Sequence, residues 1–401
     1  MSSISSNTLA TYTLFRREDA YFECSRPRPN EHGEPLAIGI TFKLLMTYIT
    51  IACLGLTAIS TFILQWKHLH RYTRPKEQRQ VVRIVFMPFF FCVIALLCLL
   101  FYEQSIYLKP IMHTYEAFCV AALFFLFLEI VCPDEENRAR FFSSVDNKDK
   151  KGNIIPGGSQ LWFNRTYAVV LQFPLTKILS CIVEITTQAA GVYCNNSLSP
   201  KHAHFWVQVF DIFIIGGAVS AIIRFWGRLK ADFDPGHHAL AKLVSFKSII
   251  LLQFLQDILF GWLNGKTFKP SAKYTYDDLY YGISMMLTAI EALLFSLFFH
   301  WSFRSRIYHE DERAGAKRMP VFRAALDALN ISDIFFGIIT AFKLLLVKSS
   351  PKGHGFKFGA QFGAPKEYDG IVDVPSISEP SRQEEGRKER QVRRERPIRG
   401  E

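Results

Sequence analysis

The sequence predicts an all-helical membrane protein whose body is a bundle of seven transmembrane helices. Apolar residues make up 49% of the 401 residues, and 37 of all residues are Phe. Charged residues make up 21%, but they gather in connecting stretches and near the C-terminus. They leave windows of about 20 residues almost free of charge, which is the length that spans the hydrocarbon core of a bilayer. A membrane-embedded body therefore fits the composition better than a water-soluble domain.

Seven apolar stretches are long enough to be transmembrane helices. They cover residues 41–66, 84–102, 115–132, 167–192, 205–226, 243–263 and 281–301. Aromatic residues that prefer the headgroup region mark five of their ends. These residues are Trp66, Tyr102, Trp226, Trp262 and Trp301.

The distribution of Lys and Arg predicts the orientation of the bundle. Six of them lie in the first loop and six in the third, whereas the second loop holds only Lys109 and the fourth only Lys201. Loops rich in Lys and Arg stay in the cytosol, so the N-terminus is predicted to lie on the opposite side. Asn195, in the fourth loop, begins a glycosylation sequon on that non-cytosolic face.

These patterns divide the chain into four parts. Residues 1–40 are a non-cytosolic N-terminal segment, 41–302 the seven-helix domain, 303–350 a cytosolic linker with an amphipathic helix, and 351–401 a basic tail. Between Arg323 and Thr340, polar or small residues recur every three or four positions, which predicts a helix lying along the cytosolic interface. The alternative is an eighth span, but the apolar stretch 334–347 is only 14 residues long and contains Lys343. The tail has too few apolar residues to fold and is predicted to be disordered.

Polar side chains inside the spans are the candidates for a solute pathway. A charge at the centre of a bilayer costs at least about 2.5 kcal/mol, so such residues usually face a cavity or a partner helix. The candidates are Gln172, Lys177, Glu184, Lys247, Gln253, Gln256, Asp257, Glu291 and Glu116. The alternative interpretation is a tie between helices or a group close to a span end, which applies best to Glu116, Glu129, Asp211 and Lys247.

Spacing refines two of these groups. Lys177 and Glu184 are seven residues apart, which places them on one helix face about 10 Å apart. Each is therefore predicted to need a partner on another helix or water in a cavity between helices, and the two are not expected to pair directly. Gln253, Gln256 and Asp257 form one stripe that suits either a polar pathway or helix association.

Other functions find no support in the sequence. No span has a central His, and there is no phosphate-binding Gly-rich loop or nucleophile elbow, so we expect no metal, no cofactor and no enzymatic activity. The formal charge of +11 follows from basic loops beside membrane helices, and no nucleic-acid partner is predicted. Cys24 and Cys194 lie on the non-cytosolic side, where they can form a disulfide.

Several motifs resemble those of a known family. They are Tyr72-Thr73-Arg74-Pro75, Gln78-Arg79, Arg83-Ile84, Met87-Pro88, Tyr115-Glu116-Ala117-Phe118, Leu171-Gln172 with Lys177, Lys247 with Gln256, and Asp327-Ala328-Leu329-Asn330. In this combination, from Thr41 to Leu346, the sequence resembles the organic solute transporter alpha-subunit and transmembrane protein 184 family, in particular its fungal and plant members. Three features depart from the family pattern: His113-Thr114 stands where Arg-Asp is usual, Leu255 replaces an aromatic residue, and a cysteine cluster is reduced to Cys132.

The resemblance implies a facilitative, ATP-independent transporter of amphipathic organic solutes such as steroid or lipid-like anions. Lys177 and Lys247 would attract the anionic headgroup. The implied partners are membrane lipids, the solute, and a single-span beta-type subunit or further copies of the chain. The implied location is the plasma membrane or an endomembrane, vacuolar or endosomal. The alternative function is a seven-helix receptor or an endomembrane scaffold or trafficking protein, although Leu128 to Cys132 lacks the Asp/Glu-Arg-Tyr pattern of G-protein-coupled receptors.

Overall fold

Helices form almost all of the chain that the structure describes, and no strand occurs in that part. The structure is a computed structural model that describes residues 33–146, 158–194, 199–263 and 271–346. Its elements are α3 (Phe42–His70), α4 (Pro75–Leu100), η1 (Tyr102–Gln104), α5 (Ser105–Val131), α6 (Arg138–Ser144), α7 (Gln160–Ala189), α8 (Ala203–Leu229), η2 (Pro235–His237), α9 (Ala239–Leu263), η3 (Asp278–Gly282, a π-helix), α10 (Ile283–Ser302), α11 (Arg306–Arg313), α12 (Val321–Leu329) and α13 (Ser332–Leu346). The predicted tail, most of the predicted N-terminal segment, Cys24 and Asn195 lie outside the described residues.

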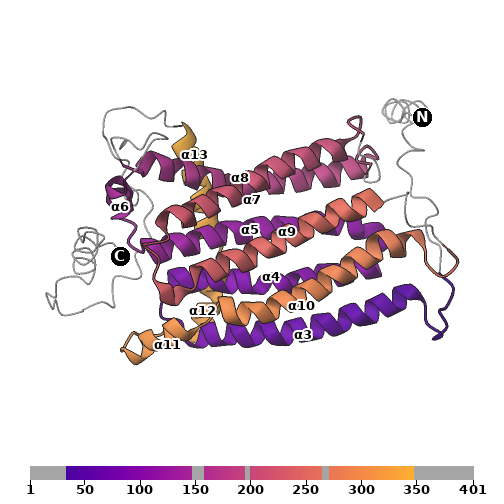
Figure 1. The fold of residues 1–401 in the computed structure, drawn as a ribbon, viewed down its shortest axis with the longest axis horizontal. Helices are drawn as coiled ribbons and strands as arrows, with labels where there is room; N and C mark the ends of the chain where they lie inside the picture. The colour runs from indigo at the N-terminus through magenta and orange to yellow at the C-terminus, as the bar shows by residue number, and fades with distance from the viewer. Residues whose placement is uncertain (1–32, 147–157, 195–198, 264–270, 347–401) are drawn as a thin grey trace, which may run out of the picture. The chain divides into compact units, whose positions relative to one another are not determined.

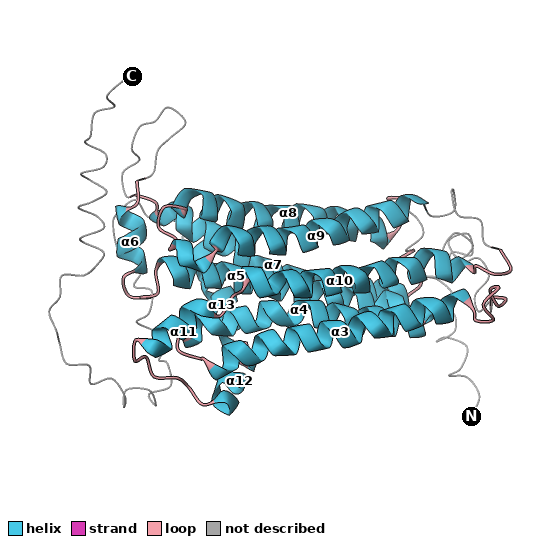
Figure 2. Cartoon of the chain, turned by 60° about the horizontal axis from the view of Figure 1, so that its bottom comes forward, coloured by secondary structure: helices cyan, strands magenta, loops and turns pink. Residues whose placement is uncertain are grey.

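The long helices lie side by side, with α4 and α5 at the centre (Figures 1 and 2). The helix α4 packs against α3, α5 and α10, while α7 packs between α5 and α8, and α9 packs mainly on α10. Large apolar side chains on the outer helices are exposed, among them Leu56 and Ile59 of α3, Phe213 of α8 and Leu294 of α10. Such a surface suits a lipid environment, and the chain is an integral, multi-pass membrane protein.

Local signals set several helix ends. The hydroxyl of Thr41 accepts a hydrogen bond from the Leu44 amide at 3.3 Å and so caps α3. Pro75 opens α4 at the first helical position, where its missing N–H would have had no helical partner. At the opposite end, the Tyr102 hydroxyl donates to Asp278 at 2.8 Å, which fixes η1 against the start of η3. We call the two ends of the bundle the Tyr72 end and the Tyr193 end, after residues that lie in loops at each.

The region after α11 differs from the other spans. Eight helical stretches are long and apolar enough to cross a membrane, and the eighth covers Val321–Leu344. That stretch is not one helix, because α12 ends at Leu329 and α13 begins at Ser332 after a break at Asn330. With 15 residues, α13 is shorter than the roughly 20 that span a bilayer. It runs across the long helices instead of along them (Figure 1). The number of spans, seven or eight, stays a prediction.

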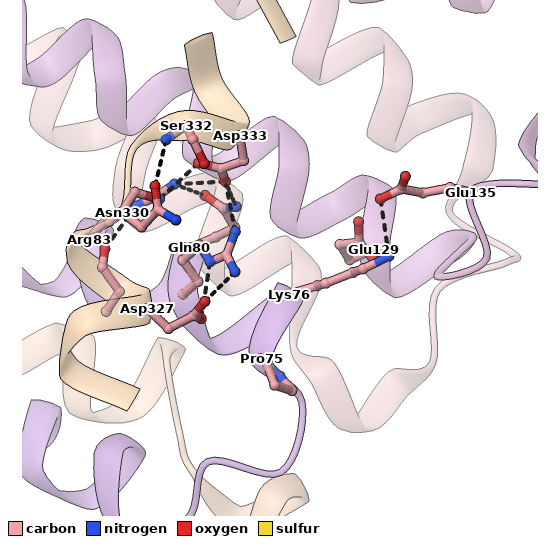
Figure 3. Close-up of polar contacts among 12 residues, drawn as sticks. Pro75, Lys76, Gln80, Arg83, Glu129, Glu135, Asp327, Asn330, Ser332 and Asp333 are labelled. Atoms are coloured by element: carbon pink, nitrogen blue, oxygen red, sulfur yellow. Dashed lines mark hydrogen bonds and ion pairs between the residues drawn. The ribbon is translucent and has the colours of Figure 1, made fainter. Parts of the chain in front are cut away.

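Ion pairs hold α12 and α13 to the first turns of α4 (Figure 3). The Arg83 guanidinium donates to both carboxylate oxygens of Asp333, at 2.8 and 2.9 Å. Arg79 pairs with Asp327 in the same way, and the Tyr72 hydroxyl donates to Asp327 at 2.7 Å. Burial and the neighbouring Asp327 carboxylate raise the pKa of Tyr72. Two motif segments about 250 residues apart in the sequence are therefore in direct contact.

Gly337 lets α13 lie close against α5 and α7. A Cβ atom at this position would come within 2.7 Å of Phe125 Cζ, 3.0 Å of Leu171 Cδ1 and 3.3 Å of the Tyr167 hydroxyl. Gly55 in α3 offers a contrast, because a Cβ atom there meets nothing within 4 Å.

We therefore predict that Gly337→Val destabilises the protein and Gly55→Val does not. Both changes place a β-branched residue in a helix, but only the first overpacks an interface, which costs typically about 1–3 kcal/mol. Melting temperature and yield of the purified protein in detergent check this. Equal melting temperatures for the two variants would show that α13 does not pack on α5 and α7 in this way.

Candidate functional site

A cavity of about 260 Å³ lies between α5, α7, α8 and α9 in the half of the bundle nearer the Tyr193 end. Its charged or titratable lining residues are Lys109, His113, Glu116, Lys177, Glu184, His204, Asp211 and Asp257. Apolar and aromatic side chains form the rest of the wall, including Ile106, Phe173, Ile212, Ile215, Phe254, Ile258, Tyr280 and Tyr281. The cavity thus combines buried charge with an apolar surface.

Lys177 is at the centre of one charged group. Its ammonium forms an ion pair with Asp211 of α8 and lies 3.7 Å from Glu184 Oε1. The Ser180 hydroxyl donates to the second oxygen of Asp211 at 2.8 Å. Because Lys177 is almost fully buried, these carboxylates supply the compensation that water would give elsewhere.

The prediction that Lys177 and Glu184 cannot pair directly is wrong. Two helical turns separate their backbones, as expected, but both side chains are long enough to reach along the helix toward each other. Asp211, interpreted from sequence as a helix tie close to a span end, is the partner on another helix that Lys177 was expected to need.

His113 is at the centre of a second charged group. Its Nδ1 lies 3.3 Å from Glu116 Oε2 on the same helix, and its Nε2 lies 3.8 Å from Asp257 Oδ2 on α9. Lys109 Nζ lies 4.0 Å from the other oxygen of Asp257. These two distances to Asp257 exceed hydrogen-bond length, and Asp257 accepts no hydrogen bond from the described part of the chain. Its side chain, 39% exposed, faces the cavity.

The polar stripe of α9 is divided between two roles. Gln253 lines the cavity and donates to Glu291 of α10 at 2.9 Å. Gln256 donates to the Ser284 carbonyl at 2.6 Å and lies outside the cavity lining, as does Glu291. Gln256 therefore joins α9 to α10, Asp257 faces the cavity, and Gln253 does both.

The remaining predicted residues are more scattered. Gln172 is half-buried outside the cavity lining, and Lys247 is exposed on α9, so Lys177 and Lys247 do not come together. Cys194 is buried and disulfide-bonded. Its predicted partner Cys24 lies outside the described residues, as does Asn195, and both assignments stay predictions.

Sequence reasoning assigned no pathway role to several lining residues. Lys109 and His113 were placed in a loop, although α5 begins at Ser105 and carries both. The signal that could have found them is the spacing of His113 and Glu116, three residues apart on one helical face. Tyr193 was also missed; its pKa is raised by burial and by the Glu184 carboxylate.

The cavity reaches the side of the bundle between α8 and α9. Ile212 and Ile258 line it and are also 44% and 49% exposed. The helix α8 packs mainly on α7 and meets α9 over a short stretch. An amphipathic molecule could therefore place a polar group at the charges while its apolar part lies between α8 and α9.

Comparison with known proteins decides the family. Residues 46–308 match the family model described as Organic solute transporter Ostalpha. The chain belongs to this family. The match covers every helix that lines the cavity and ends inside α11, before α12 and α13. The resemblance of the sequence motifs is thereby confirmed.

A curated relative is similar over part of the chain. Protein LAZ1 of Arabidopsis thaliana is 23% identical over 253 residues, which are 57% of this chain and 51% of LAZ1. The chain thus spans about half the length of that relative. No solved structure matches the chain.

We predict that Lys177→Met destabilises the protein, because it leaves Asp211 and Glu184 without their cation. Breaking a buried ion pair from one side costs about 3–5 kcal/mol, whereas replacing both partners by apolar residues is often neutral. Melting temperature and yield should fall in Lys177→Met and recover in part in Lys177→Met, Asp211→Leu, where only Glu184 lacks its cation. The matched control is Lys247→Met, which removes an exposed lysine of the neighbouring helix α9. If Lys177→Met and Lys247→Met behave alike, Lys177 carries no structural pair.

Proposed function

We propose that this protein moves amphipathic organic solutes across a membrane by facilitated transport, without ATP, through the cavity between α5, α7, α8 and α9. The observation that carries the proposal is a charged, half-apolar cavity with exposed lining residues on α8 and α9, in a chain of the organic solute transporter Ostalpha family. Ionisable groups inside a membrane are costly and usually mark substrate pathways.

The chemistry of the cavity suits an amphiphile. Its polar part would be solvated by Lys109, His113 and Asp257, and its apolar part would contact Phe254 and Ile258. In a solute that enters from the bilayer between α8 and α9, the apolar part stays in an apolar environment throughout. Its headgroup meanwhile exchanges contacts with water for contacts with these side chains. This favours solutes with one polar end and one apolar end.

Transport requires a second conformation. The cavity lies toward the Tyr193 end, and nearer the Tyr72 end ion pairs hold α12 and α13 to α4. Passage through the bundle would need the helices on the Tyr72 side of the cavity to rearrange, and a solute that binds one state better would shift the balance between states. A receptor or scaffold would bind through the same cavity without flux.

A transport assay with a matched pair of variants tests the proposal. We predict that purified protein in liposomes accelerates the entry of radiolabelled amphipathic solutes without ATP. Ile212→Trp should fill the cavity and reduce this flux about tenfold or more. A tenfold reduction corresponds to a rise of about 1.4 kcal/mol in the activation free energy. The control is Phe213→Trp, the next residue of α8, which is exposed and lies outside the lining. Flux that is absent across a panel of steroids and lipids, or equal in both variants, would contradict the proposal.

We further propose the predicted orientation, with the Tyr193 end on the non-cytosolic side. The membrane is the plasma membrane or an endomembrane, and a single-span beta-type subunit or a second copy of the chain is a candidate partner. The alternation of Lys and Arg between loops supports the orientation.

This orientation predicts glycosylation at Asn195. An endoglycosidase-sensitive shift in apparent mass should be present in the wild type and absent in Asn195→Gln. A tag before Ser5 should be protected from protease in sealed endomembrane vesicles, and a tag after Glu401 should be cleaved. Glycosylation at Asn330 instead would contradict this orientation.

A further inference from the structure

We propose that the solute is an organic cation, an amphiphile with a protonated amine headgroup, which binds between Asp257 and Glu116 in competition with a proton on His113. This rests on the proposed function, because it specifies the solute class of the same cavity. The expectation of an anionic solute drew on Lys177 and Lys247, but Lys177 is already paired with Asp211 and Lys247 lies outside the cavity lining.

The balance of charge in the cavity is the first argument. The cavity is lined by four carboxylates but by only two lysines. Lys177 is already bound by Asp211 and lies near Glu184, so it offers no free charge to a ligand. Glu116 and Asp257 are left with Lys109, which is 4.0 Å from Asp257, and with the imidazole of His113. With a neutral imidazole the cavity has a net charge of −2, which favours a cation.

The position of His113 is the second argument. Its two ring nitrogens face two different carboxylates, Glu116 and Asp257. A neutral imidazole has one N–H, so it can donate a hydrogen bond to only one of these carboxylates. The lone pair on its other nitrogen then faces the lone pairs of the other carboxylate, which is unfavourable. Either a second proton on the ring or an external N–H donor relieves this contact. The structure therefore places a proton and an ammonium group in competition for the same two carboxylates.

Charged groups of both signs surround His113, and the carboxylates outnumber the lysines. Lys109 and Glu116 face it from α5, Lys177 and Glu184 from α7, Asp211 from α8, and Asp257 from α9. Entry of a cation together with loss of the His113 proton to water leaves the charge of the cavity unchanged. A cation would thus bind more tightly as pH rises and His113 loses its proton.

The apolar and aromatic walls of the cavity suit the rest of such a molecule. Phe254, Tyr280 and Tyr281 also line the cavity, and aromatic faces attract cations. Ile212 and Ile258 lie at the exposed rim, where an alkyl chain would leave the cavity between α8 and α9. A single ammonium on an alkyl or polycyclic body fits these surroundings.

Three ten-carbon probes that differ only in headgroup test the proposal. Decylamine, decanol and decanoate are added to the purified full-length protein in neutral detergent at pH 7.5, and the melting temperature is followed against concentration. We expect decylamine to stabilise the protein more than the other two. Asp257→Asn should weaken its apparent affinity about tenfold or more, as expected for loss of a charged hydrogen-bond acceptor. The control is Glu103→Gln, which changes an exposed carboxylate outside the cavity lining.

A pH series on His113 variants tests the competition. Wild-type affinity for decylamine should fall between pH 7.5 and 5.5. His113→Gln should bind it with little pH dependence, and His113→Lys, with a permanent cation, should not bind it. Wild-type affinity that is constant with pH, or tight binding by His113→Lys, would overturn the competition. The melting temperatures without probe show whether each variant is folded.

The outcomes separate this inference from the proposed function. Preference for decanoate, or decylamine binding that is unchanged in Asp257→Asn, would overturn the cation site while transport of other solutes stands. Decylamine binding that depends on Asp257 with no flux of any solute in liposomes would support the cation site and contradict transport.

Discussion

The structure depends on the compensation of charge inside a bundle of apolar helices. A buried Lys or Arg loses the water that would stabilise it, and a carboxylate of the same chain can replace that water. Arg79 and Arg83 meet Asp327 and Asp333, and Lys177 meets Asp211. Each of these pairs joins two helices, so the positions of α12, α13 and α8 follow from where the charges lie. The carboxylate of Asp257 is the exception, because it faces a cavity without a hydrogen bond from the described chain.

Rigidity and openness are unevenly distributed over the bundle. The central helices α4 and α5 are the most buried, whereas α8 exposes much of its surface and packs mainly on α7. The cavity lies where packing is weakest, between α8 and α9. Nearer the opposite end, a dense set of hydrogen bonds around Arg83 holds α12 and α13 to α4 (Figure 3). A fixed centre beside a loosely packed helix pair is a reasonable basis for a pathway that opens in alternation.

Most of the helical pattern could be predicted from the sequence, but the charged first turns of the helices could not. The second span was expected to begin at Ile84 and the third at Tyr115, whereas α4 begins at Pro75 and α5 at Ser105. The added turns contain Arg79, Lys109 and His113, whose polarity hides a helix from a hydropathy window. Their partners Asp327 and Asp257 lie far away in the sequence, and only the fold brings them together. For the same reason, the stripe of α9 could be predicted but not its division between cavity and helix contact.

Photolabelling tests the central claim, that solutes bind in the cavity between α5, α7, α8 and α9. An alkyl amine with a diazirine on its chain would be irradiated with the purified full-length protein, and the labelled residues would be located by mass spectrometry. The account predicts labels near Ile212 of α8 and near Phe254 and Ile258 of α9, lost when unlabelled amine is added in excess. Labels spread over exposed lipid-facing residues such as Ile59 of α3, with no effect of the competitor, would contradict it.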